Sequence, residues 1–168
     1  RWISTGSATY VHSFNLTTPD GQVQHYAGTI GPYGAVSASG TPRWRANWSN
    51  TFIYKSLAVT PTVYYTSGYK TVAEDQTGAG TRNTCSSFAS IQQAYTPNQC
   101  HTKAFWDVDL TVNYRINDRW NVYANVYNLL GFKSPYDFAT YGSYLYNSAW
   151  SQKGLVLRSF HFGVNVSL

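Results

Sequence analysis

Strict alternation of apolar and polar residues over whole strand lengths is the feature that most constrains the fold of this chain. From residue 106 to residue 115, apolar side chains take every second position and polar side chains fill the others. The pattern restarts at residues 120–127 and returns at residues 159–168. Because successive side chains of a β-strand point to opposite faces, each segment predicts a strand with one apolar and one polar face.

Three further alternating segments predict strands upstream, at residues 5–14, 43–54 and 57–69, and the first of them has the weakest pattern. Pro61 lies inside the third of these, where its missing N–H predicts a bulge or an interrupted pair. Short turns are expected at residues 55–56 and 117–118, and an extra hairpin could form within residues 23–38. The remaining connections are long and polar, at residues 15–41, 70–103 and 131–153. The sequence therefore predicts an all-β antiparallel fold with about six main strands.

Two all-β architectures fit this alternation, a transmembrane barrel and a soluble sandwich, and composition favours the barrel. Charged residues are only 11% of the chain, whereas soluble domains carry roughly 25%. Aromatic residues reach 17%, and Trp44, Trp106 and Trp120 fall at strand ends, where barrels carry their interface girdles. Alternating short and long connections are also typical of outer-membrane barrels. No apolar run approaches the length of a transmembrane helix.

A phrase near the carboxyl end carries a resemblance to a known family. The residues 120–130, Trp-Asn-Val-Tyr-Ala-Asn-Val-Tyr-Asn-Leu-Leu, precede a Tyr-rich loop and an alternating terminal strand. Together with the stretch Gly-Thr-Pro-Arg-Trp-Arg-Ala at residues 40–46, this order resembles the end of the TonB-dependent outer-membrane receptors. The resemblance covers nearly the whole chain.

The resemblance implies a plugged barrel of about 22 strands, of which residues 1–168 would supply the carboxy-terminal portion. The expected plug domain and TonB box are missing from the sequence, so we expect a processed chain or a piece of a larger one. Its terminal residue, Leu168, departs from the Phe or Trp with which these barrels usually finish.

The function implied is uptake of a scarce nutrient, such as a siderophore, cobalamin or a carbohydrate, across the cell outer membrane. Expected partners are outer-membrane lipid, the rest of the barrel and its plug, and the TonB complex through the missing amino-terminal region. Nucleic acid is not an expected partner, because the basic residues that give the net charge of +5 are scattered. The alternative is a self-contained small barrel or sandwich that acts as a binding or structural module.

The last long connection is rich in aromatic side chains, and these are the candidate substrate-binding residues. They could stack on a sugar, a siderophore or another planar ligand, or simply serve as loop packing and interface girdle. The residues are Tyr136, Phe138, Tyr141, Tyr144, Tyr146 and Trp150.

The two cysteines of the chain, Cys85 and Cys100, both fall in the long connection at residues 70–103. In an oxidising compartment we expect them to form a disulfide. A metal site at Cys100 and His101 is the rival, but the ligand spacing of zinc sites is missing. No metal or other cofactor is therefore expected.

An enzyme is not expected either. The charged residues that could suggest acid and base chemistry alternate along strands or flank a turn, which predicts a polar row facing the lumen. The histidines show no catalytic spacing with serine and aspartate. The charged residues in question are Asp107, Asp109, Arg115, Asp118 and Arg119.

Overall fold

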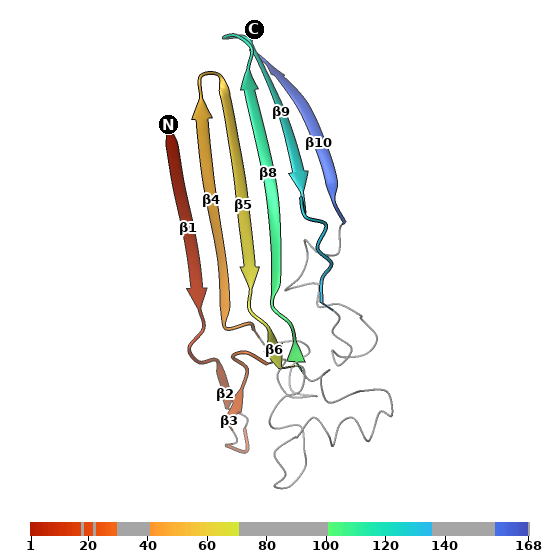
Figure 1. Ribbon diagram of the computed structural model, residues 1–168. Coiled ribbons are helices and arrows are strands. Elements are labelled where there is room, and N and C mark those ends of the chain that lie inside the picture. Colours follow the sequence, from red (N-terminus) through yellow and green to blue (C-terminus); the bar gives the residue numbers. More distant parts are fainter. Residues whose placement is uncertain (18, 22, 30–40, 71–100, 136–156, 168) are drawn as a thin grey trace.

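A computed structural model of the chain contains one long antiparallel sheet, and it describes residues 1–17, 19–21, 23–29, 41–70, 101–135 and 157–167 (Figure 1). The sheet has six strands in the order β1-β4-β5-β8-β9-β10. Their bounds are β1 Trp2–Tyr10, β4 Trp44–Tyr54, β5 Leu57–Thr66, β8 Phe105–Arg115, β9 Trp120–Tyr127 and β10 Ser159–Val166. No helix occurs among these residues, so the predicted all-β antiparallel fold is confirmed.

The six strands form a simple meander, in which every strand pairs with the next main strand along the chain. Both predicted short turns are present at one end of the sheet, and all three long connections leave from the other end (Figure 1). Lys55 takes a positive φ of 51° in the first turn, as two-residue hairpin connections require. In the second turn, Asn117 Oδ1 accepts hydrogen bonds from the backbone N–H groups of Arg119 and Trp120, each at 2.9 Å.

Two small hairpin-like pairs extend the loop end of the sheet. β2 (Asn15–Thr17) pairs with β3 (Val23–His25) inside the first long connection. This hairpin is not the one predicted within residues 23–38, because its first strand lies upstream of that range; residues 30–38 of the predicted hairpin lie outside the described residues. β6 (Tyr69–Lys70) pairs with β7 (His101–Thr102) beyond the ends of β5 and β8.

Two strands were predicted with wrong bounds. The first strand begins at Trp2 and ends at Tyr10, instead of covering residues 5–14, because its pairing with β4 runs only from Trp2 opposite Phe52 to Tyr10 opposite Trp44. The third strand ends at Thr66 instead of Tyr69, because Ser67 and Gly68 break the ladder before β6 begins.

Pro61 interrupts its strand pair as predicted. Pairing between β4 and β5 runs up to Ser49 opposite Thr62 and resumes at Phe52 opposite Val59, so the register is unchanged across the gap. Side chains bridge the two strands there, since the Ser49 and Thr62 hydroxyls are 2.8 Å apart and those of Thr51 and Thr60 are 2.9 Å apart. On its other side β5 pairs continuously with β8.

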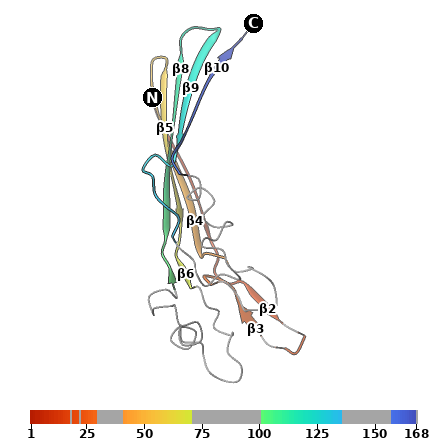
Figure 2. The same ribbon diagram turned by 90° about the vertical axis from the view of Figure 1, so that its right-hand side faces the viewer.

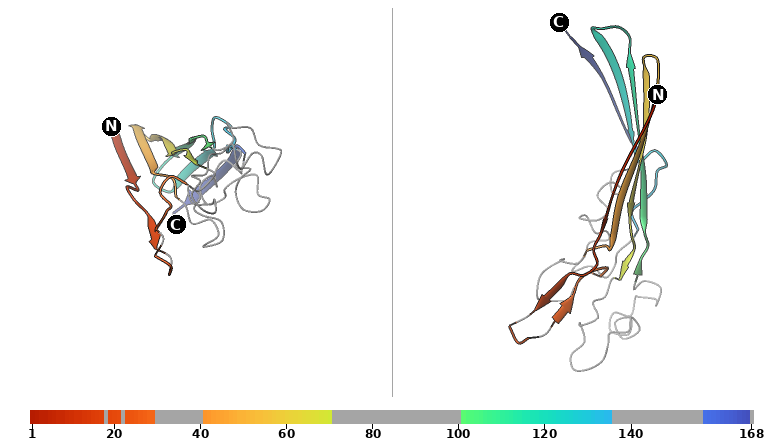
Figure 3. Two further views of the ribbon diagram at one scale, coloured as in Figure 1. Left: turned by 90° about the horizontal axis from the view of Figure 1, so that it is seen from below. Right: turned by 90° about the vertical axis from the view of Figure 1, so that its left-hand side faces the viewer.

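The sheet is a single layer. Viewed nearly edge-on, it has no second sheet packed on either face in the described part of the chain (Figure 2). Seen from below, the strands follow an arc instead of a flat plane (Figure 3). The buried hydrophobic residues that the structure describes are only Tyr26, Tyr69 and Phe105, all at or beyond the loop end. The described sheet therefore has no apolar core of its own, which argues against the sandwich alternative.

Gly163 in β10 is required by the side chain opposite it. It pairs with Tyr123, and a Cβ at Gly163 would fall inside van der Waals contact of the Tyr123 ring. We expect Gly163→Ala to lower the free energy of unfolding by about 1 to 3 kcal/mol, because the ring must move to admit the methyl group. Urea unfolding of the detergent-solubilised protein measures this change.

Gly6→Ala in β1 is the matched control for Gly163→Ala. A Cβ at Gly6 would meet its nearest atoms at 3.4 Å, an ordinary contact. Replacing Tyr123 by Ala should remove most of the penalty of Gly163→Ala. Equal effects of the two glycine substitutions would show that the Tyr123 ring does not set the requirement.

Candidate functional site

One face of the sheet carries the apolar residues of all six strands. The pairing of the strands places the apolar residues of neighbouring strands opposite one another. A single row runs through directly paired residues on every strand. Its members are Trp2, Phe52, Val59, Val112, Ala124 and Phe162. Most of the large side chains on this face are exposed, with Phe162 at 69% and Trp48 at 54%. Since an exposed apolar surface of this extent is unusual on a soluble protein, this face is a candidate contact with lipid or another apolar environment.

Aromatic side chains form two belts on this apolar face. The belt near the loop end contains ring contacts between Tyr10 and Trp44 at 4.6 Å and between Tyr65 and Trp106 at 4.4 Å. The belt near the turn end includes Trp2, Phe52, Tyr54, Tyr114 and Trp120. Along β8 the belts are separated by the eight residue steps from Trp106 to Tyr114, or about 26 Å at the usual rise. This spacing is close to the roughly 25 Å apolar band of outer-membrane barrels.

The opposite face is polar and also continuous. One row on it passes through directly paired residues of β5, β8, β9 and β10, namely Thr60, Thr111, Asn125 and His161. The predicted division of β8 is confirmed, because Asp107, Asp109 and Asn113 share the polar side while Trp106, Val108, Leu110 and Val112 share the apolar side.

Two of the charged residues considered in the sequence are buried on this polar face. Asp107 is 1% exposed and Asp109 is 7% exposed. Asp109 Oδ1 accepts a hydrogen bond from the backbone N–H of Asn128 at 3.1 Å. Arg115, Asp118 and Arg119 lie at the other end of β8 and are exposed. The structure therefore separates the charged residues of this row instead of gathering them into one site.

Asn128 anchors the start of the last long connection. It is 1% exposed and takes a positive φ of 51° just after β9. Its side chain donates to the Phe132 carbonyl at 2.7 Å and accepts from the Phe132 N–H at 2.8 Å. An asparagine is well suited to this role because it tolerates the left-handed conformation and can donate and accept at once.

The predicted ligand-contacting and disulfide residues lie outside the described residues. This applies to the cysteines Cys85 and Cys100 and to all six aromatic residues of the last long connection: Tyr136, Phe138, Tyr141, Tyr144, Tyr146 and Trp150.

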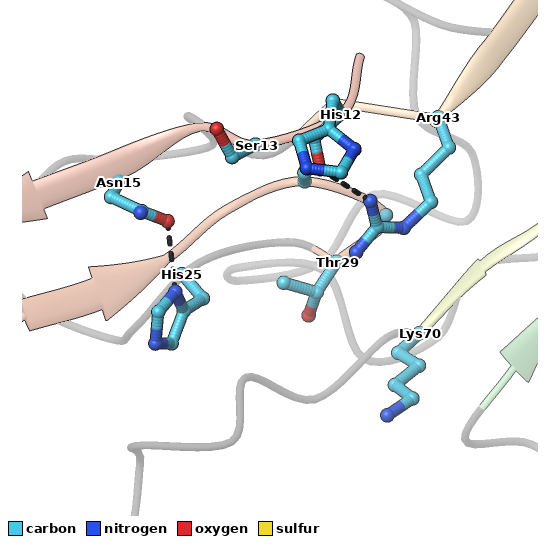
Figure 4. A pocket seen from close by; sticks show the side chains of 9 residues that line it. His12, Ser13, Asn15, His25, Thr29, Arg43 and Lys70 are labelled. Carbon is cyan, nitrogen blue, oxygen red and sulfur yellow. Dashed lines mark hydrogen bonds between the residues drawn. The ribbon is translucent and has the colours of Figure 1, made fainter. Parts of the chain in front are cut away.

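Sequence reasoning missed a polar cavity that the described residues form. It lies at the loop end, where the segments before and after the β2–β3 hairpin meet the start of β4 and the short strand β6 (Figure 4). Its volume is about 460 Å³, and its lining combines cationic, imidazole and small polar groups. The lining residues are His12, Ser13, Asn15, His25, Ala27, Gly28, Thr29, Arg43 and Lys70. No single spacing in the sequence links these residues, which come from four separate segments.

Backbone hydrogen bonds hold these segments together. The Gly28 N–H donates to the Thr41 carbonyl at 2.6 Å, and the Lys70 N–H donates to the Gly28 carbonyl at 2.9 Å. Tyr26, at 1% exposure, packs its ring against Phe14 at 5.4 Å. Residues 26–29 of the first long connection thus contact β6, and these contacts frame the cavity.

Metal-binding clusters and membrane-spanning helices are both missing from the described residues. No group of three or more His, Cys, Asp or Glu side chains there could hold a metal ion. No helix in the described segments is long and apolar enough to cross a membrane.

Comparisons with known proteins identify the fold. No family model matches the chain, and no curated protein matches it significantly. Among solved structures, the chain is similar to the ferric-catecholate import receptor Fiu from K12 E. coli, with a TM-score of 0.52 and 17% identity over 98% of this chain and 18% of the receptor. A structure of the ferric enterobactin receptor PfeA from Pseudomonas aeruginosa, in complex with enterobactin, matches with a TM-score of 0.46 and 15% identity over 93% of this chain and 22% of that chain.

The chain thus spans less than a quarter of the length of these receptors. The likeness to the first receptor covers the entire meander, which agrees with the architecture derived above from strand order and face pattern. The described sheet has the fold of part of a TonB-dependent receptor β-barrel.

Proposed function

We propose that this chain forms part of the barrel wall of a TonB-dependent transporter, which takes up a scarce nutrient across the cell outer membrane. The observation that carries the proposal is the apolar row through all six strands, bounded by two aromatic belts and backed by a polar face. A sheet crosses hydrocarbon only as a closed barrel with this division of faces. The similar receptor Fiu is an import receptor, which supports the same conclusion.

In this proposal, residues 1–168 are the carboxy-terminal portion of the barrel, and other sequence supplies the remaining strands and the plug. β1 and β10 are the two edges of the described sheet, and they are not paired with each other. Each would pair on its open side with a strand of that remainder, because an open edge cannot face lipid. The TonB complex would act on the plug, and the chain itself would have no enzymatic role.

The nutrient would be a siderophore, cobalamin, a carbohydrate or a similar compound. The aromatic residues of the last long connection, from Tyr136 to Trp150, would contribute to its binding site on the outer side. Asn128 supports this role, since its hydrogen bonds to Phe132 fix the direction in which that connection leaves β9.

Fractionation of cells that produce the complete protein tests this function against the alternative of a self-contained module. The transporter should be recovered in the outer-membrane fraction and released only by detergent. A small barrel or sandwich would instead give a soluble monomer without detergent. Recovery of the soluble monomer, or a structure of this chain alone in which β1 and β10 pair with each other, would contradict the proposal.

The cysteine pair gives a separate prediction. We expect Cys85 and Cys100 to form a disulfide on the outer side, because both fall in one long connection and the compartment oxidises thiols. Mass spectrometry of the unreduced protein from native membranes should find the two cysteine peptides linked. Two free thiols in that material would refute the pairing.

A further inference from the structure

The cavity at the loop end is rich in positive charge. Arg43 and Lys70 line it, His12 and His25 add imidazole groups, and none of the lining residues that the structure describes is acidic. Figure 4 shows the Arg43 guanidinium beside His12 and Thr29, with His25 and Lys70 on opposite sides of the space. Cationic side chains that line a cavity attract an anion that binds in it. The same charges disfavour a metal cation.

Arg43 is held in place from two directions. Its Nη1 donates to the carbonyl oxygens of His12, at 2.7 Å, and Val11, at 3.4 Å. On the other side, a Cβ at Gly28 would lie only 3.1 Å from the Arg43 Cγ and Nε atoms, so the backbone of Gly28 packs closely against the arginine stem. A side chain fixed in this way loses little conformational entropy when it binds a ligand. Within the described residues, its Nε and Nη2 groups have no hydrogen-bond acceptor in the protein.

Small polar groups complete the lining. Ser13 and Thr29 supply hydroxyls, and Asn15 lies beside His25, with Asn15 Oδ1 2.8 Å from His25 Nδ1.

The cationic side chains and the size of the cavity suit a phosphate group. Arginine presents its N–H groups in a planar fork that matches two oxygens of a phosphate, and lysine adds a compact charge. The volume of about 460 Å³ exceeds that of a single phosphate and lies in the range of small-molecule sites, about 300 to 1,000 Å³.

From these observations we propose that the cavity binds a phosphate group carried by a larger molecule. Arg43 and Lys70 would contact the phosphate oxygens, and the hydroxyls of Ser13 and Thr29 would donate to the same group. The phosphate could belong to a soluble phosphorylated compound or to a lipid headgroup at the membrane surface. The site is independent of the aromatic residues assigned above to the last long connection.

Calorimetry of the full-length protein in a neutral detergent tests this site, with inorganic phosphate as the probe. Saturable binding is expected, and Lys70→Gln or Arg43→Gln should weaken it about tenfold or more, because each removes a charged hydrogen bond. Arg45→Gln is the matched control: it removes the same charge two residues from Arg43, at an exposed position outside the lining. Arg43→Gln also removes the hydrogen bonds of Arg43 to Val11 and His12, and this could unfold the loop end. Lys70→Gln keeps those bonds, so a loss of phosphate affinity in that variant reports on binding alone.

Vesicles then distinguish the two sources of phosphate. Binding to phosphatidylcholine vesicles that contain phosphatidic acid, competed by free phosphate, would assign the site to a headgroup, whereas binding of free phosphate without vesicle preference would assign it to a soluble compound. Absence of saturable phosphate binding, or an equal loss in Arg45→Gln, would overturn the proposal. Neither result depends on recovery from the outer membrane, which tests the proposed transporter separately.

Discussion

Leu110→Arg should destabilise the barrel in a bilayer by about 2 to 4 kcal/mol, the cost of a cation at the middle of the lipid-facing surface. Leu110 lies in β8 between Pro61 and Val126 on the apolar face, midway between the two aromatic belts. The charge would therefore enter hydrocarbon far from either interface. Urea titration of the complete protein folded in lipid vesicles measures the difference.

Thr111→Arg is the control for this prediction. Thr111 is the next residue of β8, but it lies between Thr60 and Asn125 on the polar face. An arginine there would face water and polar side chains, so its cost should stay below about 1 kcal/mol. If the two substitutions cost the same, the apolar face of the sheet does not meet lipid.

Gly68→Ala should have the second large effect, confined to the loop end. A Cβ at Gly68 would lie 2.5 Å from the Thr102 carbonyl oxygen and 2.6 Å from His101 Cε1. A backbone atom cannot swing aside as the ring of Tyr123 can, so β6 and β7 must separate. We expect a cost of about 3 kcal/mol, at the upper end for overpacking.

Hydrogen exchange locates that damage. The amides of Tyr69, Lys70 and Thr102 should exchange about a hundredfold faster in Gly68→Ala, while those of β4 and β5 remain unchanged. Gly6→Ala, where the nearest atoms to the new Cβ lie at 3.4 Å, should leave all of them unchanged. Unaltered exchange at Tyr69 and Thr102 would show that the close approach is not required.

The main strands were predictable because apolar and polar residues alternate along each strand, and the pairing of the strands places residues of the same kind opposite each other. Along the apolar face of β8, β9 and β10, directly paired residues are apolar on both strands, so the local pattern and the sheet agree. β1 was misplaced because its apolar face carries the small residues Ser4, Gly6 and Ala8 between Trp2 and Tyr10, which weakens the periodic signal. Its bounds are set by the partner strand β4.

The break after Thr66 was hidden for a different reason. Tyr69 continues the two-residue period of β5, but it turns into the loop-end cluster, where it is 3% exposed, and pairs with Thr102 instead. The polar cavity at the loop end was the hardest feature to predict. His12, Arg43 and Lys70 are far apart in sequence, and the contact of Gly28 with Lys70 helps to bring their segments together.

Accessibility along β8 tests the central claim most directly. Spin labels placed one at a time from position 106 to position 113, in the complete protein reconstituted in lipid, can be probed with a membrane-soluble and a water-soluble quencher. Labels at positions 106, 108, 110 and 112 should respond to the membrane-soluble quencher, whereas labels at 107, 109, 111 and 113 should not, and the water-soluble quencher should reach the less buried positions 111 and 113. If the membrane-soluble quencher reaches position 109 as readily as position 110, the sheet is not a barrel wall with its apolar face toward lipid.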